Sequence, residues 1–268
     1  MVKKKHILST MILIVASLLM LFPIYILFMS GFKSPEEIFQ PNLLPGNPTL
    51  QNFTAMFNDK FIRGIANSLI VSVSVTVVAM ILHAMCGYAL ARFDFPLKKT
   101  LFSTIVSTLM IPMTTIFVPL FMVCKALGLT NNMLGMIIPA LFNAYGIFLF
   151  KQFYDDFPKE LEEAAEVEGC SKARIFFTIA LPLSKPMIVP LTIAFFLGTW
   201  NNYLWPLIIN KKEQFYTIQV VLANMVSGYN TPWNELIAAA AMAAIPVFVL
   251  FLLLQGQLQD GIKTTGIK

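Results

Sequence analysis

The chain has 268 residues, of which 57% are hydrophobic and 12% charged, and its mean hydropathy is +0.73. A soluble domain of this length needs far more surface charge, so composition excludes a soluble protein and indicates a polytopic membrane protein. The net charge of +5 is then read as a topology marker rather than a sign of nucleic-acid binding. Cys86, Cys124 and Cys170 are widely spaced and predict neither a disulfide framework nor a metal site.

Six apolar blocks are long enough to cross a bilayer, which takes about 20 helical residues. We predict an all-α chain, a single transmembrane domain over residues 1–268, with spans at Ile7–Met29, Ile65–Leu90, Leu101–Val123, Met133–Phe150, Met187–Ile209 and Leu236–Leu254. The first block follows three lysines, as a signal peptide does. Its apolar run is too long for one, and no cleavage site follows, which favours a membrane anchor.

The distribution of Lys and Arg predicts the orientation. With the N-terminus inside, most of the 19 basic residues fall in inner segments, so both termini are expected in the cytoplasm. Two substantial loops, residues 33–64 and 210–234, then face outward. They are either docking surfaces or plain connectors.

The charged segment 158–182 lies between the fourth and fifth spans and is predicted to face the cytoplasm. Pro158 suits a helix start, and acidic residues follow it in the first turn. Gly169 ends this helix or permits a bend, and Ser171 can cap a second one. Glu162, Glu163 and Glu166 offer charge to a basic partner, whereas the alternative is an ordinary solvated loop helix.

The second helix of this segment is predicted to be amphipathic. Its apolar residues follow the spacing of one helical face, and Pro182 is expected to end it. The predicted face consists of Ala173, Phe176, Phe177, Ala180 and Leu181.

These residues carry a family resemblance. The segment resembles the EAA loop of ABC importer permeases at every anchor, namely Glu163-Ala164-Ala165, Gly169, Ile179 and Leu181-Pro182. The resemblance implies a coupling helix that docks in a groove of a separate ATPase subunit. The residues that it assigns to this contact are Glu163, Ala164, Ala165, Glu166 and Gly169.

The resemblance extends over essentially the whole chain. "NSLIVSVSVT" at 67–76, "GYALARFDFP" at 87–96, "IPMTTIFVPLFMVCKALGLTNN" from Ile111 and "WNNYLWPL" from Trp200 are similar to carbohydrate permeases of the maltose type, MalG-like. The tail at 260–268 is similar as well, although Asp260, Lys263 and Ile267 depart from the pattern.

The resemblance implies a permease subunit in the bacterial inner membrane that carries a carbohydrate, of which an oligosaccharide is the expected form. The implied partners are a second permease, two ATP-binding subunits, an extracellular or periplasmic binding protein, the sugar and membrane lipid, with no nucleic acid. The chain has no Walker A motif, since Gly261 to Lys268 lacks the GK[ST] ending. No cofactor is expected here, and ATP and Mg are expected on the partner ATPases.

The polar tract Trp200, Asn201, Asn202 and Tyr203 interrupts the fifth span. Buried amides in a bilayer need partners, so the tract either faces a sugar path or holds helices together, and we favour packing. His83 lies inside the second span, where a polar group is either functional or bonded to a backbone carbonyl. We favour the backbone bond.

Two alternatives remain. The EAA loop does not identify cargo, so a polyamine or phosphate ester is possible in place of a sugar. An intramembrane hydrolase using Glu162, Glu163 and His83 is disfavoured, because the chain has no HExxH motif and the glutamates lie in a loop whereas the histidine lies in a span.

Overall fold

The computed structural model describes residues 2–265, and within that range only helices and their connections occur. The all-α prediction is therefore confirmed for these residues. The α-helices are α1 (Val2–Gly31), α2 (Gln51–Thr54), α3 (Asp59–Arg92), α4 (Lys98–Ser107), α5 (Met113–Ala126), α6 (Leu134–Ile137), α7 (Ala144–Asp155), α8 (Lys159–Val167), α9 (Lys172–Ile175), α10 (Leu181–Leu183), α11 (Lys185–Trp200), α12 (Leu204–Ile209), α13 (Ile218–Met225) and α14 (Trp233–Thr265).

Four stretches in the described residues are long and apolar enough to cross a membrane by themselves: Ser9–Gly31, Asp59–Arg92, Leu134–Asp155 and Trp233–Leu258. They overlap the first, second, fourth and sixth predicted spans. Two bent helix pairs bring the total to six if each pair is one span.

The third predicted span is not one straight helix. Its two halves, Lys98–Met110 and Met113–Ala126, are bent by 108°. Ile111 precedes Pro112 and is extended, with φ −90° and ψ 116°. A residue before proline disfavours the helical region, which is the physical reason for the break.

The fifth predicted span, Met187–Ile209, is divided into two helices at the polar tract that interrupts it. α11 ends at Trp200, and α12 starts at Leu204. Asn202 Oδ1 accepts from the Trp205 backbone N–H at 3.4 Å, at the start of the new helix. Polar side chains that bond to nearby backbone compete with helix continuation, so the tract breaks the helix.

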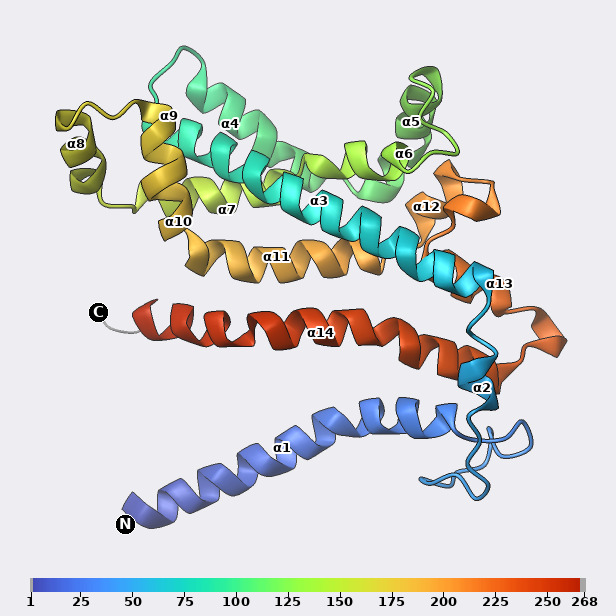
Figure 1. Cartoon of the computed structure of the whole chain (residues 1–268). Coiled ribbons are helices and arrows are strands. Elements are labelled where there is room, and N and C mark those ends of the chain that lie inside the picture. Colours follow the sequence, from blue (N-terminus) through green and yellow to red (C-terminus); the bar gives the residue numbers. More distant parts are fainter. Residues whose placement is uncertain (1, 266–268) are drawn as a thin grey trace.

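α3 lies in the middle of the bundle (Figure 1) and packs along α7, α11 and α13. α14 packs against α11 on one side and α1 on the other. None of the apolar window of α1 is buried, and the start of α1 lies apart from the other helices in Figure 1.

The two ends of the bundle differ in what they hold. The start of α1, the end of α14 and the segment α8–α10 lie at the same end in Figure 1, and α2 and α13 lie at the opposite end. Each end has its own buried core. One core joins α3, α7 and the α8–α10 segment through residues such as Tyr88, Tyr154 and Phe176, and another joins α3, α11, α13 and α14. Residues 266–268 of the predicted family-like tail lie outside the described residues.

Candidate functional site

α8 begins and ends where the sequence predicts. Pro158 occupies the N-cap position, and Glu160 and Glu162 stand in the first turn, where carboxylates are favourable. At the other end the Gly169 N–H donates to the Glu166 carbonyl at 2.9 Å. Gly169 has a φ of +80°, and an added Cβ would meet nothing within 4 Å. The glycine is therefore needed for its left-handed backbone rather than for space.

The helix after Gly169 differs from the predicted amphipathic face. Ser171 caps α9 as expected, since its Oγ accepts from the Arg174 N–H at 3.3 Å. A π-helix over Phe176–Ala180 then follows, and the chain stays helical through Pro182 to Leu183. Proline at the first turn of a new helical segment loses no hydrogen bond, which explains why it does not stop the chain here.

The π-turn also changes which residues face the core. Ile175, Phe176 and Ala180 are buried, whereas the predicted Ala173 and Phe177 are exposed. Phe176 and Ala180 are thus buried as predicted, whereas Ala173 and Phe177 are not, because the wider turn of a π-helix shifts the register of a 3.6-residue period.

The sequence indicated that Glu162 offers its charge to a partner protein. In the structure its carboxylate is paired within the chain instead. Its Oε1 accepts from Arg92 Nε at 2.8 Å, and both side chains are only 7% exposed. Tyr88 Oη donates to Glu162 Oε2 at 3.2 Å, and an Arg92 terminal nitrogen donates to the Phe157 carbonyl at 2.6 Å. We name these four residues the Arg92 cluster. Sequence reasoning missed Arg92, although a cation at the end of an apolar span was a signal.

The remaining predicted coupling residues divide into two groups. Glu163, Ala164, Glu166 and Gly169 are exposed, whereas Ala165 is buried at 7% exposure. Ala165 therefore packs on the inner side of α8, and its contact with an ATPase partner stays a prediction. Its carbonyl accepts from the Cys170 N–H at 3.0 Å, which fixes the turn after α8.

The exposed face of α8 is apolar at its centre. Val167 is 90% exposed and Leu161 is 44% exposed, with Ala164 between them on the same side of the helix. Glu166 at its edge pairs with Lys172. A face with small and branched apolar side chains inside a charged rim is typical of a protein contact.

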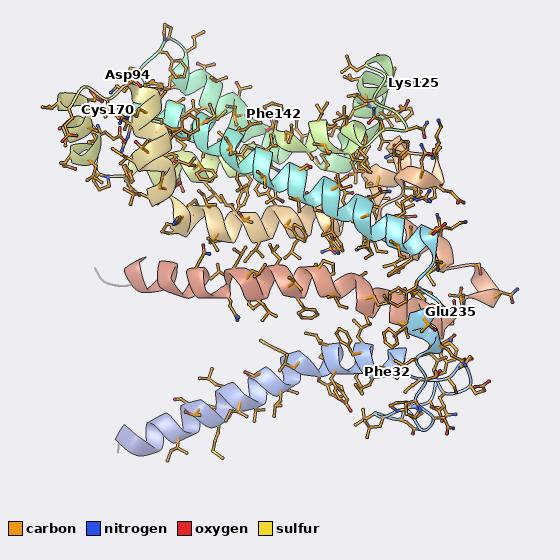
Figure 2. All side chains as sticks on the ribbon, in the orientation of Figure 1. Phe32, Asp94, Lys125, Phe142, Cys170 and Glu235 are labelled. Atoms are coloured by element: carbon orange, nitrogen blue, oxygen red, sulfur yellow. The ribbon has the colours of Figure 1, made fainter. Side chains whose placement is uncertain are left out.

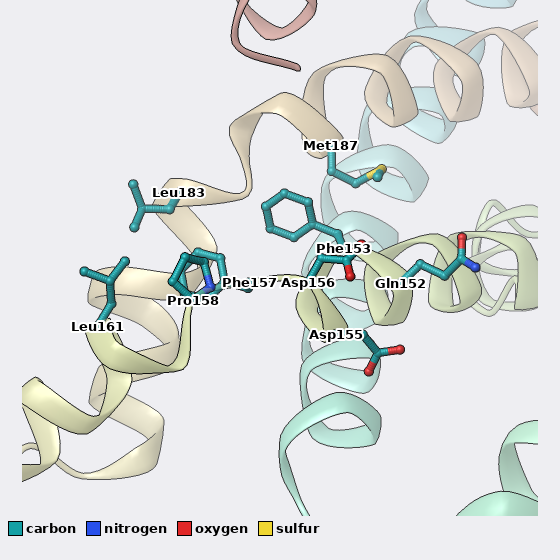
Figure 3. A pocket seen from close by; sticks show the side chains of 9 residues that line it. All are labelled: Gln152, Phe153, Asp155, Asp156, Phe157, Pro158, Leu161, Leu183 and Met187. Carbon is teal, nitrogen blue, oxygen red and sulfur yellow. The ribbon is translucent and has the colours of Figure 1, made fainter. Parts of the chain in front are cut away.

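A cleft of about 730 Å³ lies beside α8. Figure 3 shows its lining side chains, which come from the end of α7, the start of α8 and the α10–α11 connection. The lining combines apolar groups with two carboxylates and consists of Gln152, Phe153, Asp155, Asp156, Phe157, Pro158, Leu161, Leu183 and Met187. The cleft and the exposed face of α8 share Leu161, so together they form one continuous surface.

The tract at 200–203 divides into buried and exposed side chains. Trp200 is 2% exposed and stacks on Phe196 at 5.6 Å between ring centroids. Asn202 accepts from the Trp205 N–H at 3.4 Å, Asn201 is exposed, and Tyr203 is 37% exposed. Trp200 is thus a packing residue here, whereas Asn201 and Tyr203 remain accessible.

A second cleft, of about 430 Å³, opens midway along the bundle between α5, α7 and α11. Phe142 and Tyr145 are 67% and 49% exposed beside it, and Asn143, Phe195 and Thr199 also line it. Figure 2 labels Phe142 in this middle region. Sequence reasoning did not select these residues, because the break before α7 is hidden within a continuous apolar run.

His83 is buried at the same level. Its Nε2 accepts from the Asn143 N–H at 3.0 Å, and its ring packs on Phe195 at 5.2 Å. A Cβ at Gly146 would come within 2.3 Å of the ring, so α7 approaches closely here. The histidine therefore bonds to backbone, as expected, with Asn143 and Leu141 as its backbone partners. Glu162 is paired with Arg92 instead, so the hydrolase constellation is not assembled.

The chain matches known transport proteins over most of its length. Residues 83–264 match the family described as binding-protein-dependent transport system inner membrane component. The arabinooligosaccharides transport system permease protein AraQ of Bacillus subtilis (strain 168) is 31% identical over 265 residues, which is 97% of this chain and 94% of the relative. The sn-glycerol-3-phosphate transport system permease protein UgpE of Yersinia pestis bv. Antiqua (strain Antiqua) is 33% identical, over 91% of this chain and 90% of the relative.

The fold is shared with a solved transporter. The structure of a bacterial ABC transporter involved in the import of the acidic polysaccharide alginate superposes with a TM-score of 0.83 and 23% sequence identity, covering 95% of this chain and 96% of that one. A second structure, an alginate ABC transporter in complex with its pentasaccharide-bound periplasmic protein, gives a TM-score of 0.63 at 16% identity and covers 94% of each chain. With the family match over residues 83–264 and the relatives above 30% identity, the chain belongs to the family of binding-protein-dependent transport system inner membrane components.

Proposed function

We propose that this chain is the permease subunit of an ATP-driven importer that carries an oligosaccharide across the bacterial inner membrane. The observation that supports this proposal most is the exposed face of α8, which the buried Arg92 cluster holds on the bundle. The chain that presents this face belongs to a transport family. A helix with an exposed apolar centre on a rigid support is suited to dock in a groove of another protein.

α8 is the coupling helix in this proposal. Ala164 and Val167 enter a groove of an ATP-binding subunit, and Glu163 and Glu166 meet basic groups at its rim. Gly169 lets the chain turn back at the end of α8 through its left-handed backbone. The side that holds α8 is the cytoplasmic one, as the excess of Lys and Arg there favours.

The implied assembly has a second permease, two ATP-binding subunits and a solute-binding protein outside. ATP and Mg act on the ATP-binding subunits, and this chain supplies positions and forces rather than covalent chemistry. A periplasmic binding protein with an oligosaccharide accompanies the alginate transporter, and we extend that arrangement to this chain by analogy.

The cleft midway along the bundle is the surface that we assign to the sugar. Aromatic rings stack on the apolar faces of sugars, and amide and hydroxyl groups bond to their oxygens, so Phe142, Tyr145, Asn143 and Thr199 form a suitable lining. In the polar tract at residues 200–203, Asn201 and Tyr203 stay candidates for contact with the sugar. We assign Trp200 and Asn202 to helix packing and to the start of α12.

A phosphate ester is the second candidate cargo, since the relative UgpE is named for sn-glycerol-3-phosphate. Phosphate is usually bound by Arg, Lys or helix N-termini. The lining of the mid-bundle cleft in the described residues includes no Lys, Arg or His. That composition favours an uncharged carbohydrate.

The test is uptake by the complete complex. The chain, its partner permease, the ATP-binding subunits and the binding protein are reconstituted in liposomes, and uptake of labelled arabino-oligosaccharides is compared with uptake of sn-glycerol-3-phosphate. We expect ATP-dependent uptake of the oligosaccharide. Uptake of the phosphate ester alone would contradict the sugar assignment, and no ATP-dependent uptake of any solute would contradict the transport proposal.

A further inference from the structure

The segment that carries α8 is attached to α3, a helix that lies 70 residues earlier in the sequence. Arg92 is the last residue of α3, and it bonds at once to the side chain of Glu162 and to the carbonyl of Phe157. These two groups lie on opposite sides of the turn into α8. The turn and the helix are therefore held by a single guanidinium.

The ion pair in this cluster is buried on both sides, unlike the other ion pairs of the described residues. Arg92 and Glu162 are each 7% exposed. In the other pairs at least one partner is 41% exposed or more. A buried pair contributes little net stability over an apolar replacement, but removal of one partner is strongly destabilising. Its main effect is to fix the geometry of the groups that it joins.

Tyr88 links the same cluster to the rest of the bundle. Its hydroxyl donates to Glu162, and its ring meets Tyr154 of α7 edge-on at 5.3 Å and Phe176 at 5.2 Å. One turn of α3, from Tyr88 to Arg92, thus contacts α7, α8 and the π-turn that leads to α11. α8 is thus bonded directly to this turn of α3.

We propose that Arg92 is the positioning residue that passes displacement of α8 to α3, so that the coupling segment and α3 move as one body. This inference rests on the proposed function, in which a partner displaces α8. Since α3 packs along α7, α11 and α13, its movement reaches both ends of the bundle. The polar bonds of Arg92 replace direct chain continuity as the mechanical link.

The test is the number of sugar molecules imported per ATP hydrolysed by the reconstituted complex. Arg92→Met keeps the length of the side chain and removes its bonds. We expect this ratio to fall about tenfold, the size of effect seen when a coupling network is broken, while ATP hydrolysis continues and the ATP-binding subunits copurify in normal amounts. Lys98→Met is the matched control, because Lys98 lies near the same end and pairs only with the fully exposed Asp94.

A second variant separates transmission from folding. Arg92→Cys and Glu162→Cys are combined in a chain whose free cysteines, Cys86, Cys124 and Cys170, are replaced by alanine. Both buried charges are then absent, so neither is left unpaired. We expect a low import ratio that a short bis-maleimide bridge between the two cysteines restores, since the bridge replaces the lost link.

Three outcomes overturn the inference. An unchanged import ratio in Arg92→Met with normal assembly would show that α3 is moved by another route. A bridged double cysteine that stays uncoupled would show that attachment of α8 to α3 is not sufficient. A wild-type complex without ATP-driven import would overturn the proposed function as well, whereas the first two results leave it standing.

Discussion

α3 holds a connecting segment at each of its ends, but with different chemistry. At one end Arg92 binds the segment of α8 through an ion pair and a carbonyl. At the other end Asn67 donates to the carbonyls of Gln214 and Tyr216 at 2.9 Å each, and Ser68 accepts from the Ile218 N–H at 2.8 Å. The first end uses a buried ion pair, whereas the buried contacts of the second end are neutral and its ion pair, Lys60–Glu213, is exposed.

The two ends of α3 therefore differ in how strongly they hold the segment that they contact. A charge-assisted, doubly bonded contact is stronger and more directional than neutral hydrogen bonds. The α8 end therefore suits a contact on which a partner exerts force. The α13 end needs only to keep a loop in place, and amide and hydroxyl groups are sufficient to satisfy its backbone.

The largest expected effect comes from the close contact of α3 with α7. A Cβ at Gly87 would come within 2.5 Å of Phe150 Cβ and 2.7 Å of the Lys151 backbone nitrogen. Gly87→Leu should therefore separate the helices and loosen both ends, at a cost of about 3 kcal/mol or more in stability.

The measurement for Gly87→Leu is the SDS-induced unfolding midpoint of the purified chain, together with protease sensitivity of both connecting segments. Gly256→Ala is the control, because nothing lies within 4 Å of a Cβ there. A variant in which only one segment becomes sensitive would show that the two ends are not joined through α3.

Asn67→Leu should release only the segment that precedes α13. The side chain is 3% exposed and holds two backbone carbonyls, so its loss leaves both without a donor at about 1–3 kcal/mol. We expect proteolysis of residues 210–217 to increase and the segment of α8 to stay protected. Val77→Ala is the control, since Val77 lies on the same helix and is 54% exposed.

Local sequence signals predicted α8 well, because they act within one or two turns. Pro158, the early glutamates and Gly169 fix the start, the charge pattern and the end of that helix. The destination of Glu162 was not predictable in this way. Its partner Arg92 is 70 residues away, and only the packed bundle brings the two together.

The same limit explains the errors in the spans. Hydropathy counts apolar residues and is insensitive to breaks, so it does not locate the 108° bend between Lys98–Met110 and Met113–Ala126 within the third span. The π-turn at Phe176–Ala180 has no sequence signal of its own, and it rotates the face that a 3.6-residue period assigns. The coupling residues on α8 stay predictions, since no partner is present to contact them.

At the α8 end, Gly169→Val should uncouple the complex with a smaller loss of stability. A β-branched residue is disfavoured at a φ of +80°, at about 1–3 kcal/mol. We expect the turn after α8 to shift, with uptake reduced more than ATP hydrolysis in the reconstituted complex. Gly169→Asn tolerates this backbone better and should be close to wild type. Equal uptake by both variants would contradict a role for the turn.

The smallest expected effect is a difference in stability between substitutions of two buried serines on one face of α3. Ser68→Ala leaves the Ile218 N–H unpaired at the start of α13, at about 1 kcal/mol. Ser72 is equally buried at 1% exposure, but its Oγ has no partner, so Ser72→Ala should be neutral or slightly stabilising. Unfolding midpoints of the two variants measure the difference. If both lose the same stability, burial rather than the bond to Ile218 determines the effect. In that case this end of α3 holds its loop through packing and the bonds of Asn67, and the contrast with the buried ion pair of Arg92 becomes sharper.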